Sequence, residues 1–256
     1  MSTLPVRHMV AEVTRKEHIT PHYIRIYLHS DDVPYFKNTA IGDNNKILIP
    51  PVYLNEIHFP VLDENRKWIF PPKEVAPSMR TYTHRNINLE RNEIVIDFVD
   101  HGDNGPASKW ARDSKPGSKL GVMMRTEAKE LYSEADWYLF VGDSTSIPAI
   151  AAVLETLPET AQGTCIIEVH GIEDEQILFT EADITFKWIH NPTPHLKCEL
   201  SDAVKEIDIP EISKFGFVAC EFSSVNAIRS YLREDKNFTQ KELYAYSYWK
   251  IGVAEN

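Results

Sequence analysis

The run MRTYTHR, residues 79–85, gathers residue types that can bind a planar, charged ligand. Side chains alternate along an extended strand, so Arg80 and Tyr82 share one face, and Thr83 and Arg85 share the other. An aromatic ring can stack on a flavin, a hydroxyl can reach a ring nitrogen, and a guanidinium can pair with a diphosphate. The alternative is an exposed strand with solvated arginines, and the run alone leaves both interpretations open.

A second candidate site lies in DFVDHGDNGPASKWARDSKPG, residues 97–117. Here Gly105, Pro106, Ala107 and Ser108 precede a helical pattern, and proline suits the first turn of a helix because its missing N–H costs nothing there. The start of a helix carries unpaired N–H groups and partial positive charge, which suit a phosphate. A simple capped hairpin loop is the alternative.

The third candidate is FVGDSTSIPAI, residues 140–150, which reads as a strand, a tight turn and the start of a helix. A nicotinamide cofactor can bind against such a turn. The segment has a single glycine, and the chain contains no GxGxxG fingerprint, so an ordinary turn between a strand and a helix is the alternative.

The fourth candidate is YSYWKIG, residues 246–252. Tyr248 and Trp249 can simply pack the last strand, since an aromatic stripe is usually core. Lys250 and Lys46 are the basic residues that could converge on one anionic ligand, although the sequence does not show that they do.

The chain lacks a recognisable metal-ligand motif. Cys165, Cys198 and Cys220 form no CxxC pair, which argues against a zinc or iron–sulfur site built on thiolates and indicates free thiols in a reducing compartment. His18 and His22 are separated by a proline that disfavours a shared helical face. We interpret the histidines as surface or turn residues without carboxylate partners.

These candidates need two kinds of structure to position them. In the first half, residues 22–28, 47–49 and 94–99 are short strand-like runs, and six prolines between residues 50 and 77 indicate a loop or a sheet edge. We therefore expect a small β-barrel over residues 1–126.

The second half, residues 127–256, changes period. Residues 136–141, 164–170, 185–190 and 215–221 read as strands, and the chain ends with a further aromatic strand. Two helical patterns are present. One follows the strand at residues 136–141 and has Pro148 in its first turn. The other covers residues 223–235, with Ser223 or Ser224 as its N-cap. This alternation predicts a parallel α/β sheet.

The composition narrows the function. With 27 Lys and Arg against 38 Asp and Glu, the formal net charge of −11 argues against nucleic-acid binding. No apolar run reaches the length of a membrane span, and the N-terminus lacks the apolar core of a signal peptide. We expect a soluble, cytoplasmic protein.

Taken in order, the motifs resemble those of the siderophore-interacting protein family, the FAD-containing ferric-siderophore reductases of the ferredoxin-reductase-like superfamily. The resemblance runs from the strand near residue 22 through NKILIP, RTYTHR, VDHGDNGPASKWA, KPGSKLGV and YLFVGDSTSIPAIAAVLETLP to EFSSVNAIRSYLRED and YWKIG. It implies a six-stranded antiparallel flavin-binding barrel, followed by a parallel α/β domain of the nucleotide-binding kind.

The resemblance also implies roles for individual residues. Arg80, Tyr82 and Thr83, with Arg85 in the same run, are expected to hold the isoalloxazine and ribityl–phosphate region of FAD. The diphosphate and adenine side is expected to contact His101, Gly102, Pro106, Ala107, Ser108 and Trp110. Gly142, Asp143 and Thr145 are expected to face the electron donor, with Trp249 in the cofactor site. Lys46 and Lys250 are expected to attract the ferric chelate, whose own oxygens hold the iron.

Three positions depart from the family pattern. Ser144 stands where the nucleotide turn usually has a carboxylate, and Cys220 stands where a glycine precedes the glutamate. Lys250 replaces the usual arginine, which keeps the positive charge but loses the planar fork.

The expected activity is reduction of ferric siderophores through FAD, with NADH, NADPH or ferredoxin as donor. We expect a monomer. The alternatives are a flavin or ferredoxin-type oxidoreductase with another acceptor, and an iron-trafficking protein that binds siderophores without turnover.

Overall fold

The computed structural model describes residues 6–54, 56–65, 67–103, 105–194 and 196–253, and the chain forms two compact units. The first comprises the chain through His18 together with Ile24–Lys129, and the second comprises Ile19–Tyr23 together with the chain from Glu130 on. The expected boundary after residue 126 lies close to this division, but the short segment 19–23 groups with the second unit.

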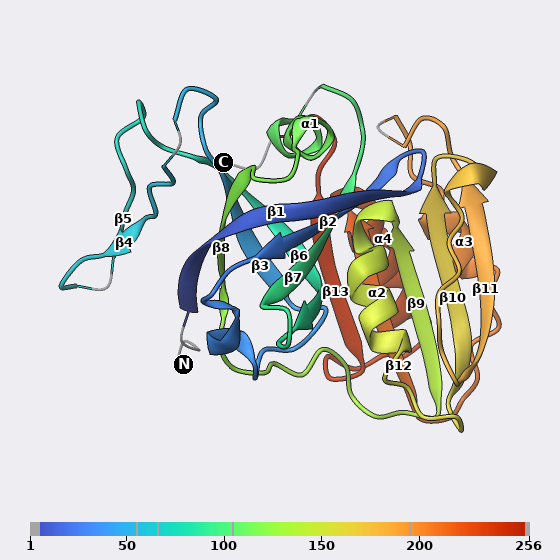
Figure 1. Cartoon of the computed structure of the whole chain (residues 1–256). Coiled ribbons are helices and arrows are strands. Elements are labelled where there is room, and N and C mark those ends of the chain that lie inside the picture. The colour runs from blue at the N-terminus through green and yellow to red at the C-terminus, as the bar shows by residue number, and fades with distance from the viewer. Residues whose placement is uncertain (1–5, 55, 66, 104, 195, 254–256) are drawn as a thin grey trace. The chain divides into compact units, whose positions relative to one another are not determined.

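Six strands of the first unit close into a barrel in the order β1-β2-β7-β6-β3-β8 (Figure 1). The strands are β1 (Val6–Thr20), β2 (Tyr23–His29), β3 (Asn44–Ile49), β6 (Ser78–Asn88), β7 (Glu93–Val99) and β8 (Lys119–Arg125). Closure joins the two ends of this region, because β1 pairs antiparallel with β8 from Val6↔Arg125 onward. The interior is filled by buried aliphatic and aromatic side chains, with Phe98 among the largest. The six-stranded antiparallel barrel is confirmed.

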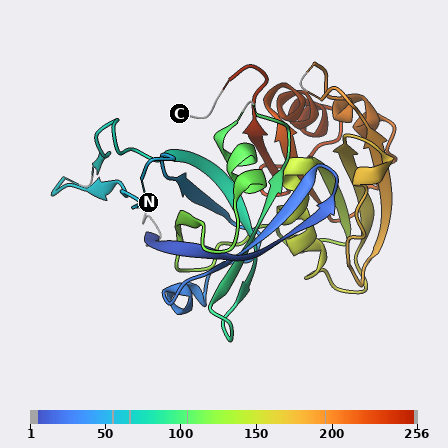
Figure 2. The ribbon, with the colours of Figure 1, turned by 45° about the horizontal axis from the view of Figure 1, so that its top comes forward.

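The proline-rich segment between β3 and β6 leaves the barrel and carries only a two-stranded sheet of β4 (Val61–Leu62) and β5 (Trp68–Ile69). It extends away from the barrel strands in both views (Figures 1 and 2). Because proline cannot donate to a strand ladder, the segment cannot continue the barrel sheet. Short helices complete this unit: η1 (Val33–Phe36) and α1 (Pro106–Asp113).

The second unit is a parallel sheet in the order β11-β10-β9-β12-β13. Its strands are β9 (Trp137–Asp143), β10 (Gln162–Val169), β11 (Asp183–His190), β12 (Lys214–Glu221) and β13 (Leu243–Trp249). The helices are η2 (Ser144–Ser146), α2 (Ile147–Leu154), η3 (Ile172–Asp174), α3 (Leu200–Lys205) and α4 (Phe222–Glu234). The parallel α/β prediction is confirmed.

The central strand β9 is buried on both faces, as its continuous apolar sequence predicts for a parallel sheet. Leu139 and Val141 join the core formed with α3 and α4. The alternate position Gly142 lies against Ile150 of α2, so helices cover both faces of the strand. The carboxyl end of β9 continues directly into η2 and α2, and the third candidate site lies at this junction.

Candidate functional site

On β6, the candidate flavin-binding residues lie where the strand meets the barrel core. The Tyr82 ring is half-buried and packs on Phe98, with ring centroids 4.6 Å apart. Thr83 is buried as well, so two adjacent side chains are both covered. The predicted alternation through Arg85 is wrong, because a register shift between His84 and Asn86 places Arg85 inside a bulge. A bulge inserts an extra residue and breaks the two-residue period.

Arg80 is a guanidinium without a carboxylate. Its Nη1 donates to the carbonyl oxygen of Met79 at 2.7 Å, and no acidic side chain in the described part of the chain pairs with it. The chain has more carboxylates than basic groups, yet none of those described pairs with this half-buried arginine. Its guanidinium is therefore suited to bind an external anion such as a diphosphate.

The loop before α1 is shaped by buried polar contacts. The Ser108 hydroxyl donates to Asp100 Oδ1 at 2.8 Å and accepts from the N–H of His101 at 3.2 Å. Arg112 Nη1 donates to the same Asp100 oxygen at 2.6 Å. Burial acts to raise the pKa of Asp100, but donors from Gly102, Ser108 and Arg112 outweigh it and lower that pKa. The Ser108 hydroxyl thus stabilises the loop through these hydrogen bonds. Its contact with the cofactor stays a prediction.

The first turn of α1 remains open to an anion. Its N-cap is Gly105, which has no side-chain acceptor, and Pro106 occupies the first turn as predicted. Gly105 also permits close approach of the His101 ring, since a Cβ at position 105 would lie 2.7 Å from His101 Cε1. Gly102 adopts a positive φ of 85°, which favours glycine. Among the described residues no side chain caps the first-turn N–H groups, which fits a phosphate there.

Trp110 of α1 faces the barrel core. Its ring lies 5.6 Å from that of Phe98, which places Tyr82, Phe98 and Trp110 in one aromatic row. Ala107, one turn earlier, is buried in the same core. The row connects the two candidate segments of the first unit, so the candidate residues of β6 and α1 are anchored to one packed core.

Lys46 borders a hollow of about 250 Å³ in the first unit. Lys46 lies opposite Thr81 across the β3–β6 pairing, and its Nζ is 2.5 Å from Thr81 Oγ1. The hollow is also lined by Trp68, Phe70, Met79, Met123 and Arg125. A cationic group beside apolar and sulfur-bearing side chains suits a ligand that is both flat and electron-rich.

In the second unit, Asp143 ends β9 as a buried carboxylate. It accepts from the Thr145 N–H at 2.9 Å, from Thr145 Oγ1 at 2.5 Å, and from Trp249 Nε1 at 2.7 Å. Burial raises its pKa, against the lowering effect of these donors. Thr145 and Trp249 are therefore held by Asp143, and their predicted contacts with an electron donor stay predictions.

Gly142 is required by the tight turn that follows β9. A Cβ at this position would lie 1.8 Å from Ser146 Oγ, whose hydroxyl donates to the Asp143 carbonyl at 2.8 Å. The glycine thus has a packing role in addition to its predicted place in the nucleotide turn.

Lys250, the C-terminal basic candidate, is exposed, and its ammonium group lies over an aromatic ring. Lys250 Nζ lies 4.7 Å from the centroid of the Phe222 ring, and the next residue, Ile251, donates its N–H to Glu221 Oε1 at 3.3 Å. Lys46 belongs to the first unit and Lys250 to the second, so their convergence stays a prediction.

One prediction about α4 is wrong. The N-cap is Glu221 rather than Ser223 or Ser224, and its carboxylate accepts the N–H groups of both serines. β12 runs straight into the helix, and the glutamate side chain is long enough to reach the N–H groups of the first turn. The sequence signal was a glutamate directly before the helical period.

Family models match both halves of the chain. Residues 12–126 match the siderophore-interacting FAD-binding domain, and residues 135–252 match the siderophore-interacting protein model. The chain is 31% identical over 246 residues to the ferric vibriobactin reductase ViuB of Vibrio cholerae, covering 95% of this chain and 90% of that protein.

Solved structures show the same architecture. A siderophore utilization protein from T. fusca superposes with a TM-score of 0.85 at 29% identity, covering 99% of this chain and 96% of the other. A ferredoxin NADP+ reductase from Neisseria gonorrhoeae with bound FAD and NADP has a TM-score of 0.62 at 11% identity, covering 94% and 98%, and shares the fold. The longest helix among the described residues has 13 residues, and none of these helices is long and apolar enough to cross a membrane.

Proposed function

Since the chain belongs to the siderophore-interacting protein family, we propose that it is an FAD-dependent ferric-siderophore reductase that takes electrons from NADH or NADPH. The observation that supports this most is the similarity to a ferric vibriobactin reductase along nearly the whole of both chains. The residues of the first unit fit FAD, because Arg80 lacks a carboxylate among its described neighbours and α1 begins without a capping side chain.

Bound FAD would supply the link between a two-electron hydride donor and a one-electron metal. In our proposal, Arg80 pairs with the diphosphate and the first-turn N–H groups of α1 bind a phosphate oxygen. Tyr82, braced by Phe98, orients the flat ring system. Thr83 is expected to contribute a hydroxyl, and His101, lying over Gly105, to border the adenine side.

The substrate in this proposal is an Fe³⁺ chelate whose own oxygens hold the metal. Hard oxygen donors retain Fe²⁺ less tightly than Fe³⁺, so reduction favours release. The overall charge of −11 repels anionic chelates, so local cations must dominate docking. Lys46, beside the hollow of the first unit, and Lys250 are the side chains that we expect to do so.

The donor site is proposed at the carboxyl end of β9, around Gly142 and Thr145. Ser144 offers no carboxylate in this turn, and Asp143 is buried beneath Trp249, so the turn has few groups that could bind a nicotinamide ribose. Ferredoxin is therefore the second donor to be tested. We further propose that the protein acts in the cytoplasm as a monomer.

The deciding experiment is anaerobic spectrophotometry of the purified FAD-loaded protein. NADH, NADPH or reduced ferredoxin should bleach the flavin absorbance, and a ferric siderophore should then restore it while a ferrous chelator captures Fe²⁺. If the bleached protein is reoxidised by other acceptors but not by any ferric siderophore, the proposed substrate is wrong. Bleaching by none of the three donors would contradict the reductase assignment.

The lysines can be tested in the same assay. The double variant K46A/K250A should raise the KM for the chelate while leaving the FAD content unchanged, and the difference should shrink at high salt. A matched control is K115A/K205A, which removes one exposed lysine from each unit. Equal KM values in the two double variants would overturn the docking role.

A further inference from the structure

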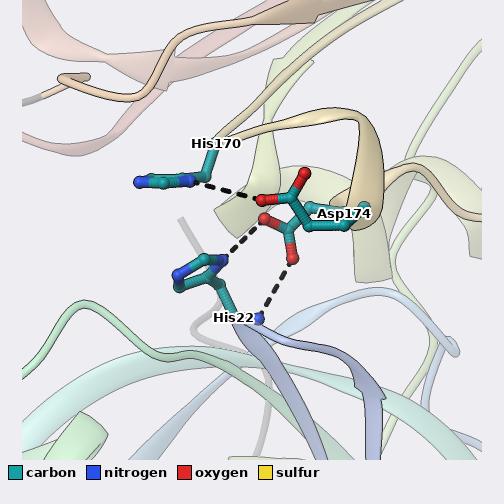
Figure 3. A group of neighbouring side chains, drawn as sticks. His22, His170 and Asp174 are labelled. Atoms are coloured by element: carbon teal, nitrogen blue, oxygen red, sulfur yellow. Dashed lines mark hydrogen bonds and ion pairs between the residues drawn. The ribbon is translucent and has the colours of Figure 1, made fainter.

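Four potential metal ligands gather in the second unit, and none of them belongs to the candidate cofactor or substrate residues. We call His22, His170, Glu173 and Asp174 the His22 cluster; one ligand atom from each lies within 4.8 Å of every other. Figure 3 shows the His22 ring facing the Asp174 carboxylate, with His170 beside them; the ion pair of His170 is with Glu173. Two chain segments far apart in sequence meet here, the turn after β1 and the loop from the end of β10 to η3.

Asp174 organises the cluster. It is only 4% exposed, and it accepts hydrogen bonds from Thr20 Oγ1 at 2.7 Å and from the His22 N–H at 3.0 Å. The His22 ring nitrogen Nδ1 lies 2.7 Å from its other oxygen. Burial acts to raise the pKa of Asp174, but the contacts with Thr20 and His22 outweigh it and lower that pKa. The expectation that His22 lacks a carboxylate partner is therefore wrong, because its partner comes from a distant segment.

His170 is the unsatisfied member. Its Nδ1 atom is buried and has no hydrogen-bond partner among the described residues, and it lies 4.0 Å from Glu173 Oε1. A buried polar atom without a partner is destabilising, because it has lost its hydrogen bonds to water. The ring also lies 4.2 Å from the ring of His22, centroid to centroid. Two neighbouring imidazoles repel if both are protonated, whereas two neutral imidazoles can share a cation.

Glu173 completes the set from the exposed side. Its carboxylate folds over Gly171, where a Cβ would lie 2.5 Å from Glu173 Oε2. The glycine leaves room for this approach. With Asp174, Glu173 supplies two negative charges beside two imidazoles, which balance the charge of a divalent cation.

We propose that the His22 cluster is a binding site for one divalent first-row transition cation of the Zn²⁺ or Fe²⁺ class. Imidazole nitrogen with carboxylate oxygen favours these ions, whereas Mg²⁺ and Ca²⁺ prefer oxygen alone. Ligand atoms about 2.1 Å from a tetrahedral metal lie about 3.4 Å from one another, so closing from 4.8 Å needs only small side-chain rotations. Such an ion would give His170 a binding partner, and it would cross-link the segment 19–23 to the β10–η3 loop.

The test is equilibrium dialysis of the chelator-treated, FAD-loaded full chain against Zn²⁺ and, anaerobically, Fe²⁺, with Mg²⁺ and Ca²⁺ as comparison ions. We expect one tightly bound Zn²⁺ or Fe²⁺ per chain and no comparable binding of Mg²⁺ or Ca²⁺. H170A breaks no hydrogen bond that the structure shows at Nδ1, and it should weaken binding at least tenfold, as should H22A. The matched control is H190A, which removes a histidine paired with Glu175 at 2.8 Å outside the cluster.

Absorption spectra of the Co²⁺-loaded protein separate this site from the cysteines, because thiolate ligands add intense charge-transfer bands that nitrogen and oxygen ligands lack. Absence of a stoichiometric Zn²⁺ or Fe²⁺ site would overturn the proposal. It would also be overturned if H22A and H170A bound the metal as tightly as H190A, or if the Co²⁺ spectrum showed thiolate ligation. The inference does not depend on reductase activity.

Discussion

The hydrogen bond between Trp249 and Asp143 allows a quantitative test of how the carboxyl end of β9 is built. Trp249→Phe removes the indole donor that lies 2.7 Å from Asp143 Oδ2 but keeps an aromatic ring. Hydrogen bonds to charged groups contribute about 1.5–3 kcal/mol. Because Thr145 still donates to Asp143, we expect W249F to lower the free energy of unfolding of the second unit by about 2 kcal/mol at pH values where Asp143 is ionised.

The effect should depend on pH in a defined direction. Burial raises the pKa of Asp143 in the folded state, so its contribution to stability is greatest below the unfolded pKa and is lost as the pH rises through the folded pKa. Removing the indole donor raises that pKa further. The deficit of W249F should therefore be largest above the folded-state pKa of Asp143 and shrink as the pH falls through that pKa.

The measurement is urea-dependent hydrogen exchange of the β9 amides, which reports on the second unit separately from the barrel. Comparison with D143N and the double variant W249F/D143N separates the hydrogen bond from the lost indole packing. A coupling energy below about 0.5 kcal/mol, which is within ordinary additivity error, would refute the reasoning. A W249F deficit that does not shrink as the pH is lowered would refute it too.

Three further outcomes follow from single buried groups. Gly142→Ala should destabilise the second unit by about 1–3 kcal/mol in urea unfolding, because its Cβ would overlap Ser146 Oγ; unchanged stability would contradict that packing. Asp100→Asn should make the free energy of unfolding of the first unit less dependent on pH in acid. The lowered pKa of Asp100 stabilises the fold above its unfolded pKa, and this contribution is lost as the pH falls through the folded pKa. An unaltered pH profile of stability would exclude the role. Burial raises the pKa of the Cys165 thiol, and contact with Cys198, together with burial, raises that of Cys220, so mass spectrometry after a thiol reagent should find both unlabelled until urea is added.

Local patterns in the sequence predicted most elements of both units. The apolar runs of β7 and β9 and the proline in the first turn of α2 are short-range signals, and the structure contains each one. The long strand β1 was not predicted, because the exposed Val10 hides the alternation of the buried Met9, Ala11 and Val13, and its partner β8 lies more than a hundred residues away. The site was predictable only as residue types, since the bulge at Arg85 depends on strand pairing.

Contacts between distant segments were beyond the reach of sequence patterns. The capture of His22 by Asp174 joins positions 152 residues apart, and no spacing rule connects them. The same holds for Asp143 and Trp249, which are 106 residues apart. In each case the fold brings a buried carboxylate next to a side chain from a distant segment. A local sequence motif contains only one of the two partners.

Barrel closure through β1 and β8 has a consequence for synthesis of the chain. The first strand waits for its partner until residue 125 has been made, and the barrel can then close before the second unit is complete. In the second unit, the central strand β9 needs β12, and β12 needs β13, so its sheet is finished only when residues 243–249 emerge. The turn at residues 19–23 is synthesised among the first and acquires its Asp174 contacts about 150 residues later. On the ribosome, we therefore expect a closed barrel to precede a sheet that folds last, with the β12-pairing edge of β9 exposed until residues 214–221 emerge.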